Sequence, residues 1–382
     1  MATPKKVMKY STSSELATLR LEDLPDELIV KVFSFLETRD LICLGQLSIR
    51  IRAITHDEQF WQKINLPYID MNRLNRNGII PARFLKIAIN NGCKYLSLYP
   101  NQVGGNLGLD QASSLTYLKL QNHKKELKQF YNFYNFKEQF SVTEELLLSC
   151  HSLQKLSMNS VTLHFDEVYT ICNQNGRTLQ ILNLNGCQIV GSWEVELKLV
   201  QTIVRSCTNL KEVNFDSTNL SDEAIQYLVE NITPSIELLS LNYVEGVSDE
   251  HIKILVNRCH QLKTLNLAHT LAITSGSLNA IIENLKPSLE RLDISEARLI
   301  DPVNLLDLRA MPKLQILIGS PPLPVKEQLQ NSLPNLVIYD FGDNEVDHLQ
   351  FLNTFTSAEN LLNKDGIWEI NAKPLKLFSS SY

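Results

Sequence analysis

The sequence has no long hydrophobic run and no excess of basic charge. No apolar stretch approaches the roughly 18 residues that a membrane-spanning helix needs. The opening residues, MATPKKVMKYSTSSELATL, lack the apolar core of a secretory signal. With 36 basic and 42 acidic side chains, the net charge is −6, whereas nucleic-acid binding usually needs a basic face. We therefore expect a chain that binds neither a membrane nor nucleic acid.

Signatures of enzyme chemistry are also missing. The chain has only fourteen glycines and contains neither the phosphate-binding pattern G-x-x-x-x-G-K-[ST] nor the nucleophile pattern G-x-S-x-G. The HFDE segment places His164 beside two carboxylates, an arrangement compatible with a metal or acid–base site. Asp166 and Glu167 also suit the first turn of a helix, and we favour that interpretation. We expect no catalytic residue, no cofactor and no metal.

The seven cysteines show no C-x-x-C spacing, which predicts free thiols in a reducing compartment. Cys150, Cys207 and Cys259 each precede a leucine by three residues, and Cys187 follows a similar apolar segment. Small thiols at recurring positions indicate packing, and metal binding is the alternative.

A repeated segment dominates the rest of the chain. RTLQILNLNGC (177–187) and HQLKTLNLAHT (260–270) share a leucine, two variable residues, an aliphatic, a polar residue and a third aliphatic. After a long first gap the repeats recur every 22 to 31 residues, the period of leucine-rich repeats, which must stack to bury their apolar faces. The leading positions are Leu115, Leu153, Leu179, Leu210, Ile236, Leu262, Leu289, Leu314 and Leu336.

Each repeat predicts a short strand followed by a helix. Alternation along the strand directs Leu182 and Leu184 into the core, and the residue between them is polar in almost every repeat. We therefore expect one face of the parallel sheet to be open to water. Ser221 and Ser248 are suited to cap the following helices. The polar positions are Lys119, Ser157, Asn183, Asn214, Ser240, Asn266 and Asp293.

These features predict an α/β solenoid over residues 93–341, with the parallel sheet on its concave face and the helices on its convex face. Within it, residues 123–140 interleave lysines with aromatics. That insertion fits a nucleic-acid-binding segment or a helix that caps the repeat core, and we favour the cap.

Residues 21–66 predict three short helices with more large apolar side chains than so small a segment can bury. Leu28, Ile29, Val32, Phe33 and Leu36 form a stripe at helical spacing. The stripe either packs on the first repeat or docks onto a partner. We expect a disordered arm at residues 1–20 and linker helices at residues 67–92.

The letters LPDELIVKVFSFL and the later FWQKINL resemble an F-box, the module that docks on the adaptor of the SCF ubiquitin ligase. An F-box followed by leucine-rich repeats resembles the FBXL family of non-catalytic substrate receptors. The sequence departs from the family at Ser48 and Ile51, where cysteine and tryptophan are usual. The resemblance implies binding to the adaptor, and through it to cullin and a RING subunit. The implied adaptor-binding residues are Leu24, Pro25, Leu28, Ile29, Val32, Phe33, Leu36 and Trp61.

Residues 255–274, 311–341 and 366–377 are similar to the S-phase-kinase-associated F-box subfamily. That similarity implies a phosphorylated cell-cycle substrate, such as a cyclin-dependent-kinase inhibitor, together with a small Cks accessory protein. It also implies proteasomal degradation of that substrate and a location in the nucleus and cytoplasm. A C-terminal tail, residues 342–382, would fold back over the concave face.

The subfamily carries tryptophan, aspartate and arginine at positions that face Cks. They align with Ser217, His269 and Glu296, so none of the three matches. A repeat scaffold that works outside any ligase is the alternative function. The residues expected to bind substrate or accessory protein are Asn214, Ser217, Ser240, Tyr243, Asn266, His269, Asp293, Glu296 and Trp368.

Overall fold

The computed structural model describes two compact units, which divide the chain into residues 1–63 and 64–382. Predictions about the N-terminal arm, the lysine and aromatic insertion and the tail with Trp368 lie outside the described residues, as does the first half of the predicted linker, residues 67–79. The described residues are 21–36, 40–41, 44–45, 47–65, 80–99, 103–104, 107–109, 112, 114–121 and 145–340.

The first unit is built on two helices that pack together. Pro25 precedes the first of them, and two acids in its opening turn favour the helix dipole. The Ser48 hydroxyl caps the other by accepting from the Ile51 N–H at 3.2 Å. The Arg50 guanidinium joins the two helix starts by donating to Asp26 Oδ1 at 2.6 Å. The described elements are η1 (Leu21–Asp23), α1 (Asp26–Phe33), α3 (Ile49–Thr55) and η2 (Glu58–Phe60).

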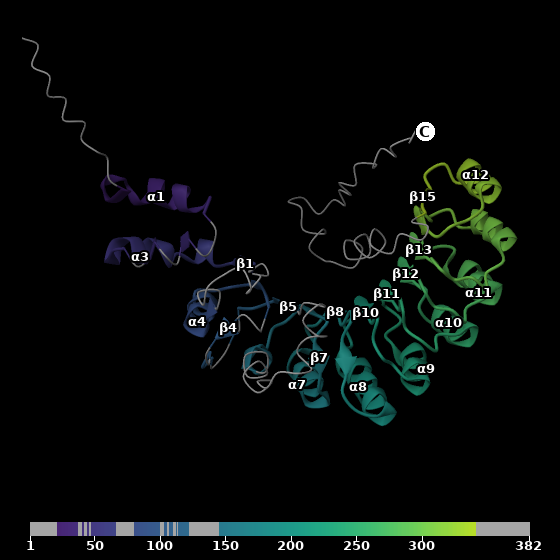
Figure 1. Ribbon diagram of the computed structural model, residues 1–382, viewed down its shortest axis with the longest axis horizontal. Helices are drawn as coiled ribbons and strands as arrows, with labels where there is room; N and C mark the ends of the chain where they lie inside the picture. Colours follow the sequence, from purple (N-terminus) through teal and green to yellow (C-terminus); the bar gives the residue numbers. More distant parts are fainter. Residues whose placement is uncertain are drawn as a thin grey trace, which may run out of the picture. The chain divides into compact units, whose positions relative to one another are not determined.

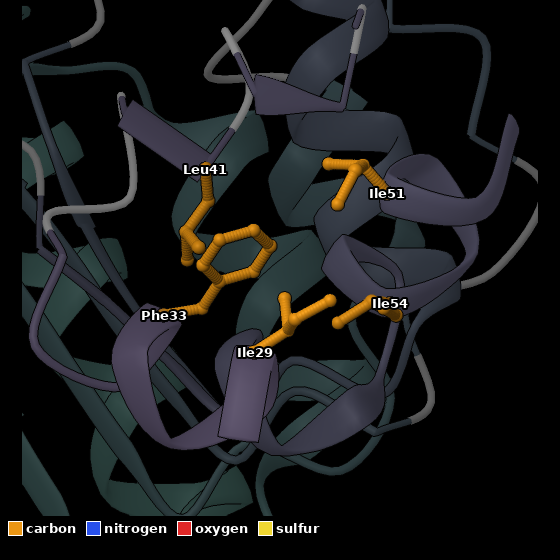
Figure 2. Close-up of a cluster of buried hydrophobic side chains, with 5 residues drawn as sticks. All are labelled: Ile29, Phe33, Leu41, Ile51 and Ile54. Atoms are coloured by element: carbon orange, nitrogen blue, oxygen red, sulfur yellow. The ribbon is translucent and has the colours of Figure 1, made fainter. Parts of the chain in front are cut away.

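Five apolar side chains from these helices and the segment between them form the core of the first unit (Figure 2). All five are buried, and Phe60 packs against the cluster with its ring 6.4 Å from that of Phe33. The cluster consists of Ile29, Phe33, Leu41, Ile51 and Ile54.

The second unit is a solenoid whose described residues form one eleven-stranded sheet with strands in chain order. From β3 onward every pairing is parallel. Its strands are β1 (Lys63–Asn65), β3 (Tyr95–Leu98), β5 (Tyr117–Gln121), β6 (Lys155–Asn159), β8 (Ile181–Asn183), β10 (Glu212–Asn214), β11 (Leu238–Ser240), β12 (Thr264–Asn266), β13 (Arg291–Asp293), β14 (Ile316–Ile318) and β15 (Val337–Tyr339). Two short pairs lie beside it, β2 (Ile80–Pro81) with β4 (Val103–Gly104) and β7 (Thr162–Leu163) with β9 (Gln188–Ile189).

Helices follow the strands, so that within this unit the strands lie on the inner, concave side and the helices from α7 to α12 on the outer side (Figure 1). This arrangement confirms the predicted fold class. The helices are α4 (Ala82–Asn90), α7 (Phe165–Asn175), α8 (Trp193–Ser206), α9 (Asp222–Asn231), α10 (Asp249–Val256), α11 (Ser275–Leu285), η4 (Pro302–Ala310) and α12 (Leu323–Ser332).

The repeat leucines form the core of the solenoid, as predicted. All nine leading positions, from Leu115 to Leu336, are 4% exposed or less. Cys150, Cys187 and Cys259 are buried among them, and burial raises the pKa of the first two thiols to about 12 and that of Cys259 to about 11. At ordinary pH these thiols are protonated packing groups and weak nucleophiles.

The HFDE segment begins a helix, as expected. His164 is the N-cap of α7, and its backbone N–H donates to Glu167 Oε2 at 3.0 Å. Among the described residues, no three or more His, Cys, Asp or Glu side chains gather as metal ligands. In that same part of the chain, no helix has the length and apolar character needed to cross a bilayer.

Candidate functional site

The apolar stripe of α1 is divided between two faces of the helix. Ile29 and Phe33 point into the core of the first unit and are essentially inaccessible. Leu28 and Val32 precede them by one residue each, which rotates them by about 100° around the helix. They are therefore exposed, at 49% and 46%.

Exposed apolar side chains continue beyond α1 in the first unit. Phe35, Leu47 and Ile49 are 82%, 66% and 86% exposed. So many accessible apolar side chains in such a small unit are typical of a protein interface. We call this set the helical patch: Leu28, Val32, Phe35, Leu47 and Ile49.

The other predicted adaptor-binding residues lie in several environments. Pro25 is exposed, while Leu24 and Leu36 are half-buried against the core cluster. Trp61 is buried, and its indole N–H donates to the Thr55 carbonyl at 2.7 Å. Trp61, like Ile29 and Phe33, is therefore an interior residue of the folded chain, and the accessible members of the set are Pro25, Leu28 and Val32.

The two positions that depart from the family pattern, Ser48 and Ile51, support the fold of the first unit. Ile51 is part of the first unit's core, and Ser48 caps α3. Neither belongs to the helical patch, so the departures change the interior and a helix start while the exposed surface stays apolar.

Four predicted substrate-binding residues form a row along consecutive strands β10 to β13. Each follows its strand by three residues and has a left-handed backbone, with φ between 53° and 59°. We call them the strand-end row: Ser217, Tyr243, His269 and Glu296. The rings of Tyr243 and His269 stack 3.8 Å apart at an angle of 11°.

The left-handed conformation follows from how each strand ends. The Ser217 N–H donates to the Asn242 carbonyl at 2.8 Å, and the next residue, Thr218, donates back to Phe215 O at 3.2 Å. Tyr243 and His269 make the equivalent bonds to the next strand. The main chain therefore turns sharply at these positions while remaining bonded to its neighbour.

The predicted open polar face is wrong for the described repeats. Asn214, Ser240, Asn266 and Asp293 were expected to meet solvent and a partner, but all four are 3% exposed or less. Three of these side chains accept hydrogen bonds from main-chain N–H groups just after their strands. Asn214 Oδ1 accepts from the N–H two residues later at 2.7 Å, and Asn266 and Asp293 accept equivalently at 3.0 Å. Buried main-chain donors need such acceptors.

Ser240 does not accept in this way because its hydroxyl donates to Asp216, and Asp216, in the connection after β10, accepts the main-chain N–H instead. Asp216 Oδ1 accepts from the Asn242 N–H at 2.9 Å and from Ser240 Oγ at 2.5 Å, while Oδ2 accepts from Asn214 Nδ2 at 3.0 Å. Burial raises the pKa of this carboxyl to about 6, although the three hydrogen bonds oppose the shift.

Apolar residues beside the strand-end row were not singled out from the sequence. Leu271 and Leu299 lie in the strand-to-helix connections after β12 and β13, while Val303 and Leu323 lie at the starts of η4 and α12, and all four are 59 to 68% exposed. We call them the apolar rim. The sequence did carry a signal for these residues. Each is a large aliphatic residue surrounded by polar or turn-forming residues, and none fits the pattern of the strands or of the buried helix positions.

Comparisons with known proteins agree with this organisation. The chain matches the family model described as the SKP2 LRR domain over residues 113–336, more than half of its length, and an F-box-like model over residues 21–67.

Two curated proteins are similar over part of the chain. DNA repair protein rhp7 of Schizosaccharomyces pombe is 31% identical over 159 residues, which covers 40% of this chain and 28% of rhp7. Ubiquitin ligase complex F-box protein UFO1 of Saccharomyces cerevisiae is 28% identical over 138 residues, covering 29% of this chain and 20% of UFO1. The chain thus spans less than a third of the length of either relative. A crystal structure of the yeast Rad7 and Elc1 complex shares 16% identity at a TM-score of 0.38, covering 82% of this chain and 91% of that one.

Proposed function

Because this chain belongs to the SKP2 LRR domain family and carries an F-box-like segment before that domain, we propose that it is the substrate-recognition subunit of an SCF-type ubiquitin ligase. The helical patch is the observation that carries the proposal, since it leaves five large apolar side chains of the F-box-like segment exposed. The printed name of UFO1, an F-box protein of a ubiquitin ligase complex, supports the same role.

In this proposal the chain positions a substrate for ubiquitin transfer and catalyses no step itself. The helical patch binds the adaptor, which connects to cullin and the RING subunit, and the solenoid holds a protein substrate. Holding the substrate near the ubiquitin-conjugating partner raises its effective concentration there, so that transfer becomes nearly intramolecular.

The finer part of the proposal concerns the substrate. We propose a phosphorylated cell-cycle protein, such as a cyclin-dependent-kinase inhibitor, marked in the nucleus and cytoplasm for proteasomal degradation. Glu245 is exposed in the strand-to-helix connection after β11, where its carboxylate repels a phosphate group, and Arg298, after β13, is already paired with Glu296. A Cks-type accessory protein would therefore hold the phosphate, and the strand-end row would contact other parts of the assembly.

The adaptor contact can be tested with Leu28→Glu combined with Val32→Glu. Both residues are exposed on α1 and lie outside the buried core cluster, so the fold should be preserved. Burying two unpaired charges at an apolar interface should weaken adaptor binding by about a hundredfold or more, as for central interface residues. The measurement is co-elution of the co-expressed chain and SCF adaptor in size-exclusion chromatography, with titration calorimetry.

A matched control pair comes from the second unit. Leu148→Glu with Val190→Glu alters side chains that are 47% and 46% exposed, almost the same as Leu28 and Val32. This pair should leave adaptor binding unchanged. If the α1 variant still co-elutes like the unaltered chain, the receptor role is overturned, and the alternative of a repeat scaffold outside any ligase takes its place.

A further inference from the structure

The strand-end row has large side chains at positions whose left-handed backbone glycine would adopt without strain. Gly186 has the equivalent position after β8, with φ 69°. Tyr243, His269 and Glu296 adopt φ between 55° and 59° instead, a conformation that costs a non-glycine residue on the order of 1–3 kcal/mol. Three consecutive repeats therefore retain side chains at a backbone cost, which marks them for contact with a ligand.

The edge of the solenoid on which the row lies is acidic. The strand-to-helix connections at residues 215–223, 241–250, 267–276 and 294–303 contain eight carboxylates and one arginine, with Asp216 buried and Glu296 paired with Arg298. The opposite connections, at residues 205–212, 231–238, 257–264 and 286–291, contain six lysines or arginines and three glutamates. The two edges of the same repeats thus carry opposite charge.

Helix dipoles account for only part of this asymmetry. Asp222, Glu223, Asp249 and Glu250 lie in the first turns of α9 and α10, where negative charge is favourable. Glu245 is four residues before α10, and Glu296 is six residues before η4. These positions lie beyond the first turn, where the dipole effect fades. Glu296 is paired with Arg298, whose Nη2 donates to its Oε2 at 2.6 Å, so Glu245 is the one of these two acids that adds to the negative field.

The apolar rim runs beside these acids. Leu271, Leu299 and Leu323 occur in three successive repeats, each within about six residues of its strand, and Val303 begins the η4 segment. No hydrophobic cluster of the described residues needs them, since all are more than half exposed. A ligand for this edge must therefore offer apolar side chains as well as positive charge.

The spacing of the repeats suits an extended peptide. Neighbouring strands lie about 4.8 Å apart, and packed helices on the outer side about 10 Å apart. The connections between them have an intermediate spacing. Alternate side chains of an extended chain are about 6.8 Å apart, so one side chain in two can meet each successive repeat.

Resting on the receptor role proposed above, we infer that this edge binds an extended substrate segment in which lysine or arginine alternates with leucine-like residues. The flat Tyr243–His269 pair and the apolar rim contact the aliphatic groups, and the exposed carboxylate of Glu245, with the exposed acids in the first turns of α9 and α10, faces the cations.

The test uses the whole chain and three fluorescent twelve-residue peptides. The first repeats Leu-Ser-Lys-Ser three times, the second replaces each lysine by glutamate, and the third replaces each leucine by serine. We expect the first to bind at least about tenfold more tightly than either other peptide in fluorescence anisotropy. Raising the salt concentration should weaken it several-fold, because exposed charges are screened.

Variants then locate the binding surface. Leu271→Ser with Leu299→Ser should weaken the lysine peptide by about tenfold, as expected for removing two apolar contacts. The matched pair Leu148→Ser with Tyr169→Ser, which lies outside the strand-to-helix connections, should have no effect. Glu245→Lys should also weaken binding, whereas Glu283→Lys on the outer helix α11 should not, because both residues are exposed but only Glu245 lies on this edge.

Equal or tighter binding of the glutamate peptide, undetectable binding of the lysine peptide, or equal effects of the rim and control variants would each overturn the inference. Adaptor co-elution, measured on the same preparations, separates the two proposals. If the chain binds the adaptor but not the lysine peptide, the peptide site is disproved and the receptor role stands. If it binds the lysine peptide at the rim but not the adaptor, the receptor role is disproved and the rim remains a site for basic segments.

Discussion

At the scale of single residues, the strand ends illustrate how one short side chain alters the chemistry of another. In four repeats an asparagine or aspartate accepts the main-chain N–H two residues later. The Ser240 hydroxyl instead donates to Asp216, whose carboxylate reaches across from the connection after β10 and accepts that N–H. A buried acid is thereby placed in the sheet, with a pKa raised to about 6 by its burial.

This raised pKa predicts a specific pH dependence. Because the folded-state pKa of Asp216 lies above its unfolded value of about 3.9, the folded state binds the extra proton between pH 4 and 6. The stabilising contribution is complete below pH 4 and is lost as the pH rises through 6. In urea titrations, the stability of the unaltered chain relative to Asp216→Asn should fall by roughly 2 to 3 kcal/mol from pH 4 to pH 7. A constant difference across this range would contradict the assignment.

At the scale of elements, one carboxylate joins consecutive repeats. Asp249 lies in the first turn of α10, yet its oxygens accept from the Thr274 N–H at 2.8 Å and from Ser277 Oγ at 2.5 Å, at the start of α11. Burial alone would raise the pKa of Asp249, but these hydrogen bonds outweigh it and lower the pKa. The start of one helix thus fixes the start of the next.

Removing this link should destabilise the solenoid. Asp249→Ala leaves the Thr274 and Ser277 donors without their charged acceptor, which should lower the free energy of unfolding by roughly 2 to 3 kcal/mol. Glu250→Ala, in the same helical turn but with its side chain 72% exposed, should change it by less than about 0.5 kcal/mol. Chemical denaturation followed by circular dichroism measures both, and similar losses in the two variants would refute the linking role.

At the scale of the whole molecule, the second unit is a stack in which each repeat is supported by its neighbours. A central repeat has partners on both sides, whereas β15 is the last strand of the described sheet and pairs only with β14 there. Stability in such arrays is approximately a sum of repeat and interface contributions. The same core change should therefore have different consequences along the stack.

Leu265→Ala and Leu336→Ala compare the two situations. Leu265 is fully buried in β12, and its truncation should cost about 2 to 5 kcal/mol and lower the protection of many repeats. Leu336, beside the last strand, should cost less and loosen mainly β14 and β15. Hydrogen exchange followed by mass spectrometry would show the difference, and an equally widespread loss of protection in both variants would argue against a stack of this kind.

The buried side of the fold was predictable from the sequence because burial follows a period. The repeat leucines had to stack, and they did. The accessible side was harder, since Leu28, Ile29, Val32 and Phe33 all fit one broad helical stripe. Only the packing of α3 decides that the second and fourth of these residues are core.

The polar strand positions posed the opposite difficulty. Alternation correctly placed Asn266 between two core leucines, but its exposure depends on where the buried main-chain donors find acceptors. Leu271 and Leu299 fall in connections, where no periodic rule applies. Sequence reasoning thus located the strand-end row and overlooked the rim beside it.

The main chain at Ser217, Tyr243 and His269 is held by bonds from their own N–H groups to the adjoining strand, and Glu296 shares their backbone angles. None of these bonds uses a side chain. The four positions can therefore be exchanged together for residues that tolerate a left-handed backbone, such as glycine, asparagine, aspartate and histidine. A library limited to such codons at these four positions would sample new client preferences on one backbone.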